Sequence, residues 1–126
     1  MTDDRFENAT PVLAVADYAR AKSFYADALG FTVMEEGGDP PGFGIVRCGK
    51  ALIFLDGWTT PTPPQTCWTV YIHVRDINSV RADLKAQGVS PGEIRHTAYG
   101  MREFDVTDPD GHILCFGEDM DGEKAQ

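Results

Sequence analysis

The residues best suited to chemistry lie in the segment MREFDV, near the C-terminal end of the chain. Glu103 and Asp105 alternate there with Phe104 and Val106, so both carboxylates share one strand face if the apolar pair faces a core. Such a face can receive the cation of a ligand or be simply solvated, and both interpretations stay open. A general acid–base pair is a weaker hypothesis, because carboxylates on one edge-strand face are common. Arg102 could neutralise either carboxylate.

The cysteines and histidines give weaker signals. The chain has three of each, and no two cysteines have CxxC spacing. Free thiols in a reducing cytoplasm fit this pattern, and a structural zinc site does not. Cys115 could line a site, and we favour an inert wall over a nucleophile because no base is assigned to it. We interpret His73 as a hydrogen-bonding wall residue, and expect His96 at the surface and His112 turned away from Cys115.

Aromatic residues outside the hydrophobic runs suggest a third kind of chemistry, because flat conjugated ligands stack on such rings. Trp58 stands between Gly57 and a loop rich in Thr and Pro. Two roles are equally open for it: contact with a ligand, or a structural role only. The residues expected to line a ligand cavity are Phe43, Phe54, Trp58, Thr69, Tyr71, His73, Tyr99, Met101, Glu103, Asp105 and Cys115.

Composition limits the classes of partner. The chain has 126 residues, 42% of them hydrophobic, and a formal net charge of −9. One core can form at this length, and the negative charge argues against binding DNA or RNA. No apolar run is long enough to span a membrane, and the polar, acidic start is unlike a signal peptide, so we expect a cytoplasmic protein. The charge could serve solubility or attract a cationic ligand.

An internal repeat sets the organisation of the chain. Both copies run from Val-x-Asp through an amphipathic stretch to a Gly followed by an apolar residue. The two copies are residues 14–31 and 73–89. Asp17 and Asp76 are expected to cap the two helices, and Gly30 and Gly88 to end them in a left-handed conformation.

Strands are expected around each helix, which predicts two βαβββ modules. Their ranges are 11–15, 31–36, 43–48 and 51–56 in the first half, and 68–74, 93–97, 101–106 and 112–117 in the second. In the strand 68–74, alternation places Trp68, Val70 and Ile72 on one face and Tyr71 and His73 on the other. The whole chain is then one domain. Its parts are module one at about 9–57, a linker at 58–66, module two at about 67–118 and an acidic tail at 119–126.

This pattern resembles the vicinal oxygen chelate superfamily, which includes glyoxalase I, extradiol dioxygenases, fosfomycin-resistance enzymes and bleomycin-resistance proteins. The resemblance rests on PVLAVADYARAKSFYADALGF and YGMREFDVTDPDGHILCFGE, and covers about residues 9–118. It implies an α+β fold with two tandem βαβββ modules that form cupped mixed sheets. For the bleomycin-resistance branch it also implies a homodimer with ligand sites where subunits meet.

Enzymes of that superfamily usually hold a divalent metal through His, Gln or Glu on the first and last strand of each module. The matching positions here are Thr10, Phe54, Thr69 and Cys115, which do not make such a site. The resemblance is therefore to the metal-free branch that sequesters antibiotics. It implies self-resistance by capture of a bulky aromatic natural product, with no catalytic residue, metal or cofactor.

Alternatives remain open. A metal-dependent lyase, isomerase or dioxygenase could use other residues such as His73, Glu103 or Glu118. The fold could also have been adapted to bind a small metabolite or a partner protein. The sequence does not distinguish a glycopeptide from an enediyne or another aromatic ligand, nor does it say whether the modules exchange between subunits.

Overall fold

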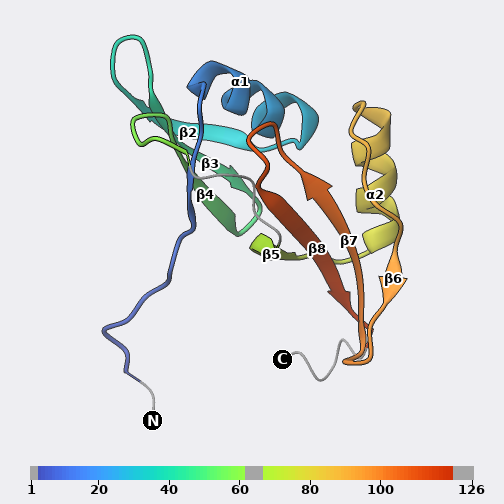
Figure 1. Ribbon diagram of the computed structural model, residues 1–126. Helices are drawn as coiled ribbons and strands as arrows, with labels where there is room; N and C mark the ends of the chain where they lie inside the picture. Colours follow the sequence, from blue (N-terminus) through green and yellow to red (C-terminus); the bar gives the residue numbers. More distant parts are fainter. Residues whose placement is uncertain (1–2, 62–66, 121–126) are drawn as a thin grey trace.

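The computed structural model describes residues 3–61 and 67–120 and contains two four-stranded mixed sheets (Figure 1). The first has the order β1-β4-β3-β2 and the second β5-β8-β7-β6. The first sheet comprises β1 (Val12–Ala14), β2 (Thr32–Gly37), β3 (Phe43–Cys48) and β4 (Ala51–Asp56). The second comprises β5 (Trp68–His73), β6 (Arg95–His96), β7 (Met101–Thr107) and β8 (Ile113–Asp119). The predicted α+β fold with two βαβββ modules is confirmed.

The helix of the first module covers one face of its sheet. Helix α1 (Tyr18–Ser23) continues into a π-helical turn, η1 (Phe24–Ala28). Asp17 caps it as predicted, because its carboxylate accepts the Arg20 N–H at 3.1 Å. A Cβ at Gly44 of β3 would overlap the ring of Tyr18, so a glycine there lets the helix lie close to the sheet.

The helix of the second module, α2 (Ile77–Ala86), is capped differently from the prediction. Asp76 has a left-handed backbone (φ +54°), and its carboxylate makes no capping hydrogen bond. Glu118 of β8 replaces it and accepts the N–H groups of Asp76 and Ile77 at 2.8 and 3.2 Å. The prediction for Asp76 was therefore wrong because a carboxylate 42 residues away reaches the same N–H groups.

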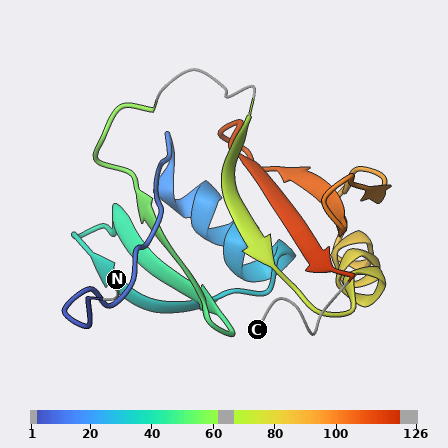
Figure 2. The same cartoon turned by 90° about the horizontal axis from the view of Figure 1, so that it is seen from below.

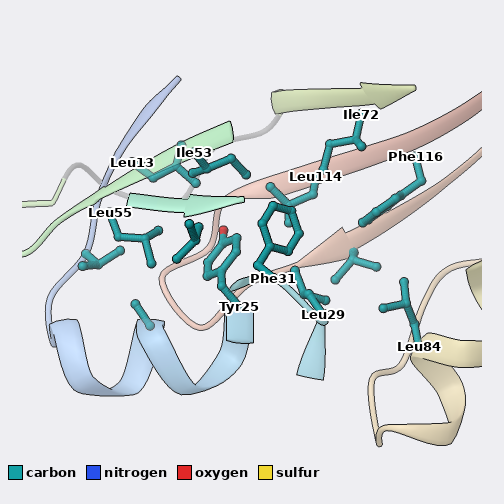
Figure 3. Packing of buried hydrophobic residues seen from close by; sticks show 14 of the residues in the cluster. Leu13, Tyr25, Leu29, Phe31, Ile53, Leu55, Ile72, Leu84, Leu114 and Phe116 are labelled. Atoms are coloured by element: carbon teal, nitrogen blue, oxygen red, sulfur yellow. The ribbon is translucent and has the colours of Figure 1, made fainter. Parts of the chain in front are cut away.

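One core joins the two modules (Figure 3). Tyr25 of η1 has no exposed surface and lies among side chains of both sheets, with Leu55 from the first and Leu114 from the second. Its hydroxyl donates to Asp108, in the turn before β8, at 2.7 Å. Burial and the neighbouring Asp108 raise the pKa of Tyr25 far above its ordinary value, so the phenol remains a donor.

The turn that precedes β8 makes further contacts with the first module. Asp110 accepts the Ala16 N–H at 2.9 Å and pairs with Arg20 at 3.0 Å. His112 is buried, and its Nε2 lies 2.7 Å from the carbonyl oxygen of Ala14. In Figure 2 this turn reaches toward the first module beside α1. The turn therefore fixes one module against the other.

Two predicted segments fall only partly within the described residues. Positions 62–66 of the linker and 121–126 of the acidic tail lie outside them. Within the described ranges, no helix has the length and apolar character that a membrane crossing requires.

Candidate functional site

Each sheet has one face away from its helix, and the predicted ligand residues lie mainly on these faces. In β4, Ile53 and Leu55 are buried in the core, whereas Phe54 points to the opposite side. In β7, Phe104 and Val106 are buried in the core, which places Glu103 and Asp105 on the other face as predicted.

The first group, which we call the Trp58 platform, comprises Phe43, Phe54 and Trp58. The Trp58 indole stacks on Phe43 with ring centroids 5.7 Å apart and planes inclined by 24°. Phe43 in turn contacts Phe54 edge to face at 5.6 Å. Trp58 nevertheless remains 65% exposed. The platform is an aromatic surface, with one large ring open to solvent.

Trp58 is held in place from two further sides. Its backbone N–H donates to the Asp56 carboxylate at 2.9 Å, and Asp56 also accepts the Thr59 hydroxyl at 2.6 Å. These bonds lower the pKa of Asp56, with the Thr59 hydroxyl as the largest cause. On the other side a Cβ at Gly42 would overlap the indole, so a glycine is needed for the hairpin to reach the ring. The orientation of the indole is therefore fixed before any ligand arrives.

The second group, the Glu103 cluster, is centred on a carboxylate with no exposed surface. Glu103 Oε2 accepts the hydroxyls of Tyr71 and Tyr99 at 2.8 and 2.7 Å. Glu103 Oε1 accepts Arg95 Nη2 at 2.9 Å. The cluster comprises Tyr71, Arg95, Tyr99, Glu103, Asp105 and Cys115. Every oxygen of Glu103 has a protein donor, and because Glu103 has no exposed surface, a ligand could contact it only after a neighbouring side chain moves.

These donors keep Glu103 ionised. Burial alone would raise its pKa, but the hydrogen bonds from Tyr99, Tyr71 and Arg95 outweigh it and hold the pKa below the usual value. The same carboxylate raises the pKa of Tyr71 above its ordinary value, after burial as the largest cause. Glu103 thus acts as a buried anion that orients two tyrosines and an arginine.

Arg95 was missed in the sequence analysis, where Arg102 stood as the possible neutralising residue. Arg102 instead pairs with Glu118 at 3.4 Å. Arg95 pairs with Glu103 at 2.9 Å and with Asp105 at 3.1 Å. Because Arg95 lies directly opposite Glu103 in the β6–β7 ladder, the pairing of these two strands was the signal that could have found it.

Trp68 was predicted on the face opposite Tyr71, and the structure places the two in contact. Their ring centroids are 5.2 Å apart, and the Arg95 guanidinium lies 5.8 Å from the Trp68 ring centroid. The register of β5 against β8 shifts between Trp68 and Val70, and such a bulge reverses the alternation of side chains. Trp68 thereby joins the edge of the Glu103 cluster.

Cys115 is buried beside the cluster, with its Sγ 3.5 Å from Arg95 Nη2. Burial, reinforced by the negative charges of Glu103 and Asp105, raises the pKa of its thiol to about 12. A thiol that stays protonated at neutral pH is a poor nucleophile, which agrees with the inert wall favoured from the sequence.

The remaining predicted residues lie around this group. Thr69 is at the bulge, where its hydroxyl accepts the Ile113 N–H at 3.3 Å. Met101 is half-buried at the start of β7. His73 is exposed, 4.9 Å from the Tyr71 ring, and both line a cavity of about 300 Å³ together with Leu52 of the first module. This cavity lies where residues of the two modules meet.

The predicted site is thus divided between two aromatic groups. Among residues 3–61 and 67–120, no hydrogen bond, ion pair or ring contact connects the Trp58 platform with the Glu103 cluster. Each module contributes one group on the face away from its helix.

The four superfamily metal positions lie on or beside strands β1, β4, β5 and β8. Thr10 precedes β1, and the residue that pairs with Phe54 is Val12. The residue that pairs with Cys115 is Tyr71, not Thr69. In the described part of the chain, no three His, Cys, Asp or Glu side chains are grouped so that they could hold a metal ion. The donor set at these positions does not fit a divalent metal centre.

Comparisons with known proteins agree with this architecture. The bleomycin resistance protein of Geobacillus stearothermophilus is 26% identical over 124 residues, covering 84% of this chain and 92% of the relative. TnmS3, an antibiotic binding protein from Streptomyces sp. CB03234, has a similar structure with a TM-score of 0.72 and 23% identity, covering 87% and 93% of the two chains. TioX from Micromonospora sp. ML1 superposes with a TM-score of 0.73 at 19% identity, covering 90% and 99%.

The sequence also matches the model of a protein family. A family model with the description Glyoxalase/Bleomycin resistance protein/Dioxygenase superfamily matches residues 8–116, which cover nearly all of both modules and include both aromatic groups. The chain belongs to the glyoxalase/bleomycin resistance protein/dioxygenase superfamily.

Proposed function

We propose that this protein captures a bulky aromatic natural product by non-covalent binding and confers resistance to it without changing it chemically. The observation that carries the proposal is Trp58, whose indole stacks on Phe43 and whose backbone N–H is held by Asp56, while 65% of the residue stays exposed. A large ring fixed in this way binds a flat ligand with little loss of side-chain entropy. The bleomycin resistance relatives support the same function.

The chemistry of the Glu103 cluster supports binding over catalysis. Its carboxylate is fully buried and accepts three donors, and its thiol has a pKa of about 12, so neither is available as a base or nucleophile at neutral pH. Capture alone requires nanomolar to micromolar affinity, equivalent to roughly 8 to 12 kcal/mol of binding free energy.

We further propose that the protein acts as a homodimer in the cytoplasm. The exposed aromatic residues Trp58, Trp68 and Tyr99 lie on faces away from the helices, and a second chain could bring two such faces together around one ligand. Light scattering coupled to gel filtration tests the dimer, for which we expect about twice the monomer mass of 13.8 kDa.

A titration of tryptophan fluorescence tests the proposed function. The panel comprises a bleomycin, an enediyne and a polycyclic aromatic antibiotic, and we expect at least one to quench the signal with a Kd below about 10 μM. If no compound binds below about 100 μM, capture of these three classes of antibiotic is refuted and the proposal loses most of its support. Elemental analysis adds a separate check, since one tightly bound transition metal per chain, with turnover lost on chelation, would favour the enzyme alternative.

A further inference from the structure

In the Glu103 cluster, two nitrogens of Arg95 make no hydrogen bond to any residue in the ranges 3–61 and 67–120. The hydrogen bonds of Arg95 to described residues all run through Nη2, to Glu103, Asp105 and Cys115. Nη1 and Nε therefore have no hydrogen-bond partner among these residues, and the Arg95 side chain is 41% exposed. A guanidinium with two such groups can bind an acceptor from outside the protein.

The position of Arg95 is fixed before any ligand binds. Glu103 and Asp105 hold one of its nitrogens at 2.9 and 3.1 Å, and Trp68 lies against the guanidinium at 5.8 Å. A fixed planar fork loses little entropy when it forms a further hydrogen bond. The hydroxyl of Tyr99 donates to Glu103 as well, and most of Tyr99 is exposed. A flat molecule beside Arg95 would therefore contact an aromatic surface.

The carboxylates of the cluster are less suited to a ligand than Arg95. Glu103 has no exposed surface and three donors, and Asp105, although 37% of its side chain is exposed, is already paired with Arg95 at 3.1 Å. With Glu103 and Asp105 ionised and Arg95 protonated, the formal charge of the three is −1, which disfavours an anionic ligand. A cation placed against Nη1 and Nε would be repelled by the exposed guanidinium, so a neutral acceptor such as a ring carbonyl or a quinone oxygen fits this site.

We propose that Arg95 is the specificity-determining residue of this face, and that it selects flat ring systems that carry a neutral hydrogen-bond acceptor over flat cations. This proposal rests on the proposed function, because it concerns the ligand of the same aromatic surface. The sequence had left open a cationic ligand at this face. The present proposal favours a ligand that bears a carbonyl instead.

Two probes with the same three fused rings test the proposal. Acridone carries one ring carbonyl, whereas 9-aminoacridine is a cation at neutral pH without a carbonyl. Their intrinsic fluorescence anisotropy gives a Kd for each with the full-length protein. We expect acridone to bind the wild type roughly tenfold more tightly, and Arg95→Gln to remove this difference by weakening acridone alone.

Two further variants make the test decisive. Arg81→Gln also removes one positive charge from module two, but Arg81 contacts Pro91 and Gly92 on the helix side, so we expect both affinities to stay unchanged. Arg95→Lys keeps the charge and serves if Arg95→Gln does not fold. It should weaken acridone several-fold, since a lysine lacks the planar fork.

The outcomes separate the two proposals. Tighter binding of 9-aminoacridine to the wild type, or unchanged acridone affinity in the Arg95 variants, overturns the role of Arg95 and leaves aromatic capture standing. Failure of both probes to bind below about 100 μM overturns the selection by Arg95, and the antibiotic panel then decides separately whether aromatic capture stands.

Discussion

Tyr99 donates a 2.7 Å hydrogen bond to Glu103, although 63% of Tyr99 is exposed and Glu103 has no exposed surface. The bond ties a ring at the surface to an anion in the interior. Tyr71 donates to the same oxygen at 2.8 Å, so one buried carboxylate orients two aromatic side chains. The aromatic surface of module two therefore depends on an ionised Glu103.

Removal of the two hydroxyls should have unequal effects on stability. We expect Tyr71→Phe to lower the free energy of unfolding by about 1 to 2 kcal/mol, because a partly buried donor to a charged group is lost. Tyr99→Phe should cost less, since water can replace its hydroxyl at the more exposed position. Urea denaturation at pH 7 measures both, and a larger loss for Tyr99→Phe would contradict the described burial.

The stability contributed by Glu103 should depend on pH in a definite direction. Its pKa is lower in the folded than in the unfolded protein, so its contribution is complete above its ordinary pKa of about 4.3 and disappears as the pH falls through the folded value. We expect Glu103→Gln to lower the free energy of unfolding at pH 7 by about 2 kcal/mol, and this difference to shrink below about pH 4.

Urea denaturation over a pH series measures the effect, with Glu35→Gln on the exposed part of β2 as the control. The control should show a small difference from wild type at every pH. A Glu103→Gln difference that stays constant or grows on acidification would mean that the carboxylate is not held ionised by its donors.

The three cysteines should react at very different rates. Cys48 and Cys67 are exposed, whereas Cys115 is buried with a thiol pKa of about 12. We expect a disulfide reagent such as DTNB to modify two thiols quickly in the native protein at pH 8, and the third only after denaturant is added. Rapid modification of all three would show that Cys115 is accessible and would reopen its role as a nucleophile.

The contact between Tyr25 and Asp108 should stabilise the joint between the modules. Tyr25→Phe removes a fully buried hydroxyl, and we expect a loss of about 1 to 3 kcal/mol in the free energy of unfolding. The control is Tyr18→Phe, whose hydroxyl bonds to the partly exposed Glu36 within module one and should cost less than about 1 kcal/mol. Equal losses would show that the joint contributes no more than a contact within one module.

Loss of the Trp58 indole should affect binding more than stability. Because Trp58 is 65% exposed, we expect Trp58→Ala to change the free energy of unfolding by less than about 1 kcal/mol, yet to weaken an aromatic ligand roughly tenfold or more. Trp68 remains as the fluorescent reporter. Phe6→Ala removes another exposed aromatic residue, outside both groups, and should leave affinity unchanged. Unaltered binding by Trp58→Ala would exclude the platform from the site.

Alternation and the internal repeat predicted the two βαβββ modules, because side chains on a half-buried strand must alternate, and the resemblance to the superfamily predicted their mixed sheets. The strands 43–48 and 51–56 have the predicted bounds. The placement of Glu103 and Asp105 on one strand face followed from the same rule. The face on which Trp68 lies did not, because the bulge before Val70 is a property of the β5–β8 pairing and not of the local sequence. Arg95 and the Glu118 cap also depend on contacts between distant strands, which one strand alone does not reveal.

The most direct test of non-catalytic capture is recovery of the ligand. The protein is incubated with an equimolar amount of the tightest-binding antibiotic of the panel, the complex is isolated by gel filtration, and the ligand is released by denaturation and weighed by mass spectrometry. We predict about one ligand per site with unchanged mass after hours of incubation, and biological activity that returns on release. Conversion of the ligand to a product of altered mass, repeated when a further equivalent of ligand is added, would contradict capture and identify an enzyme.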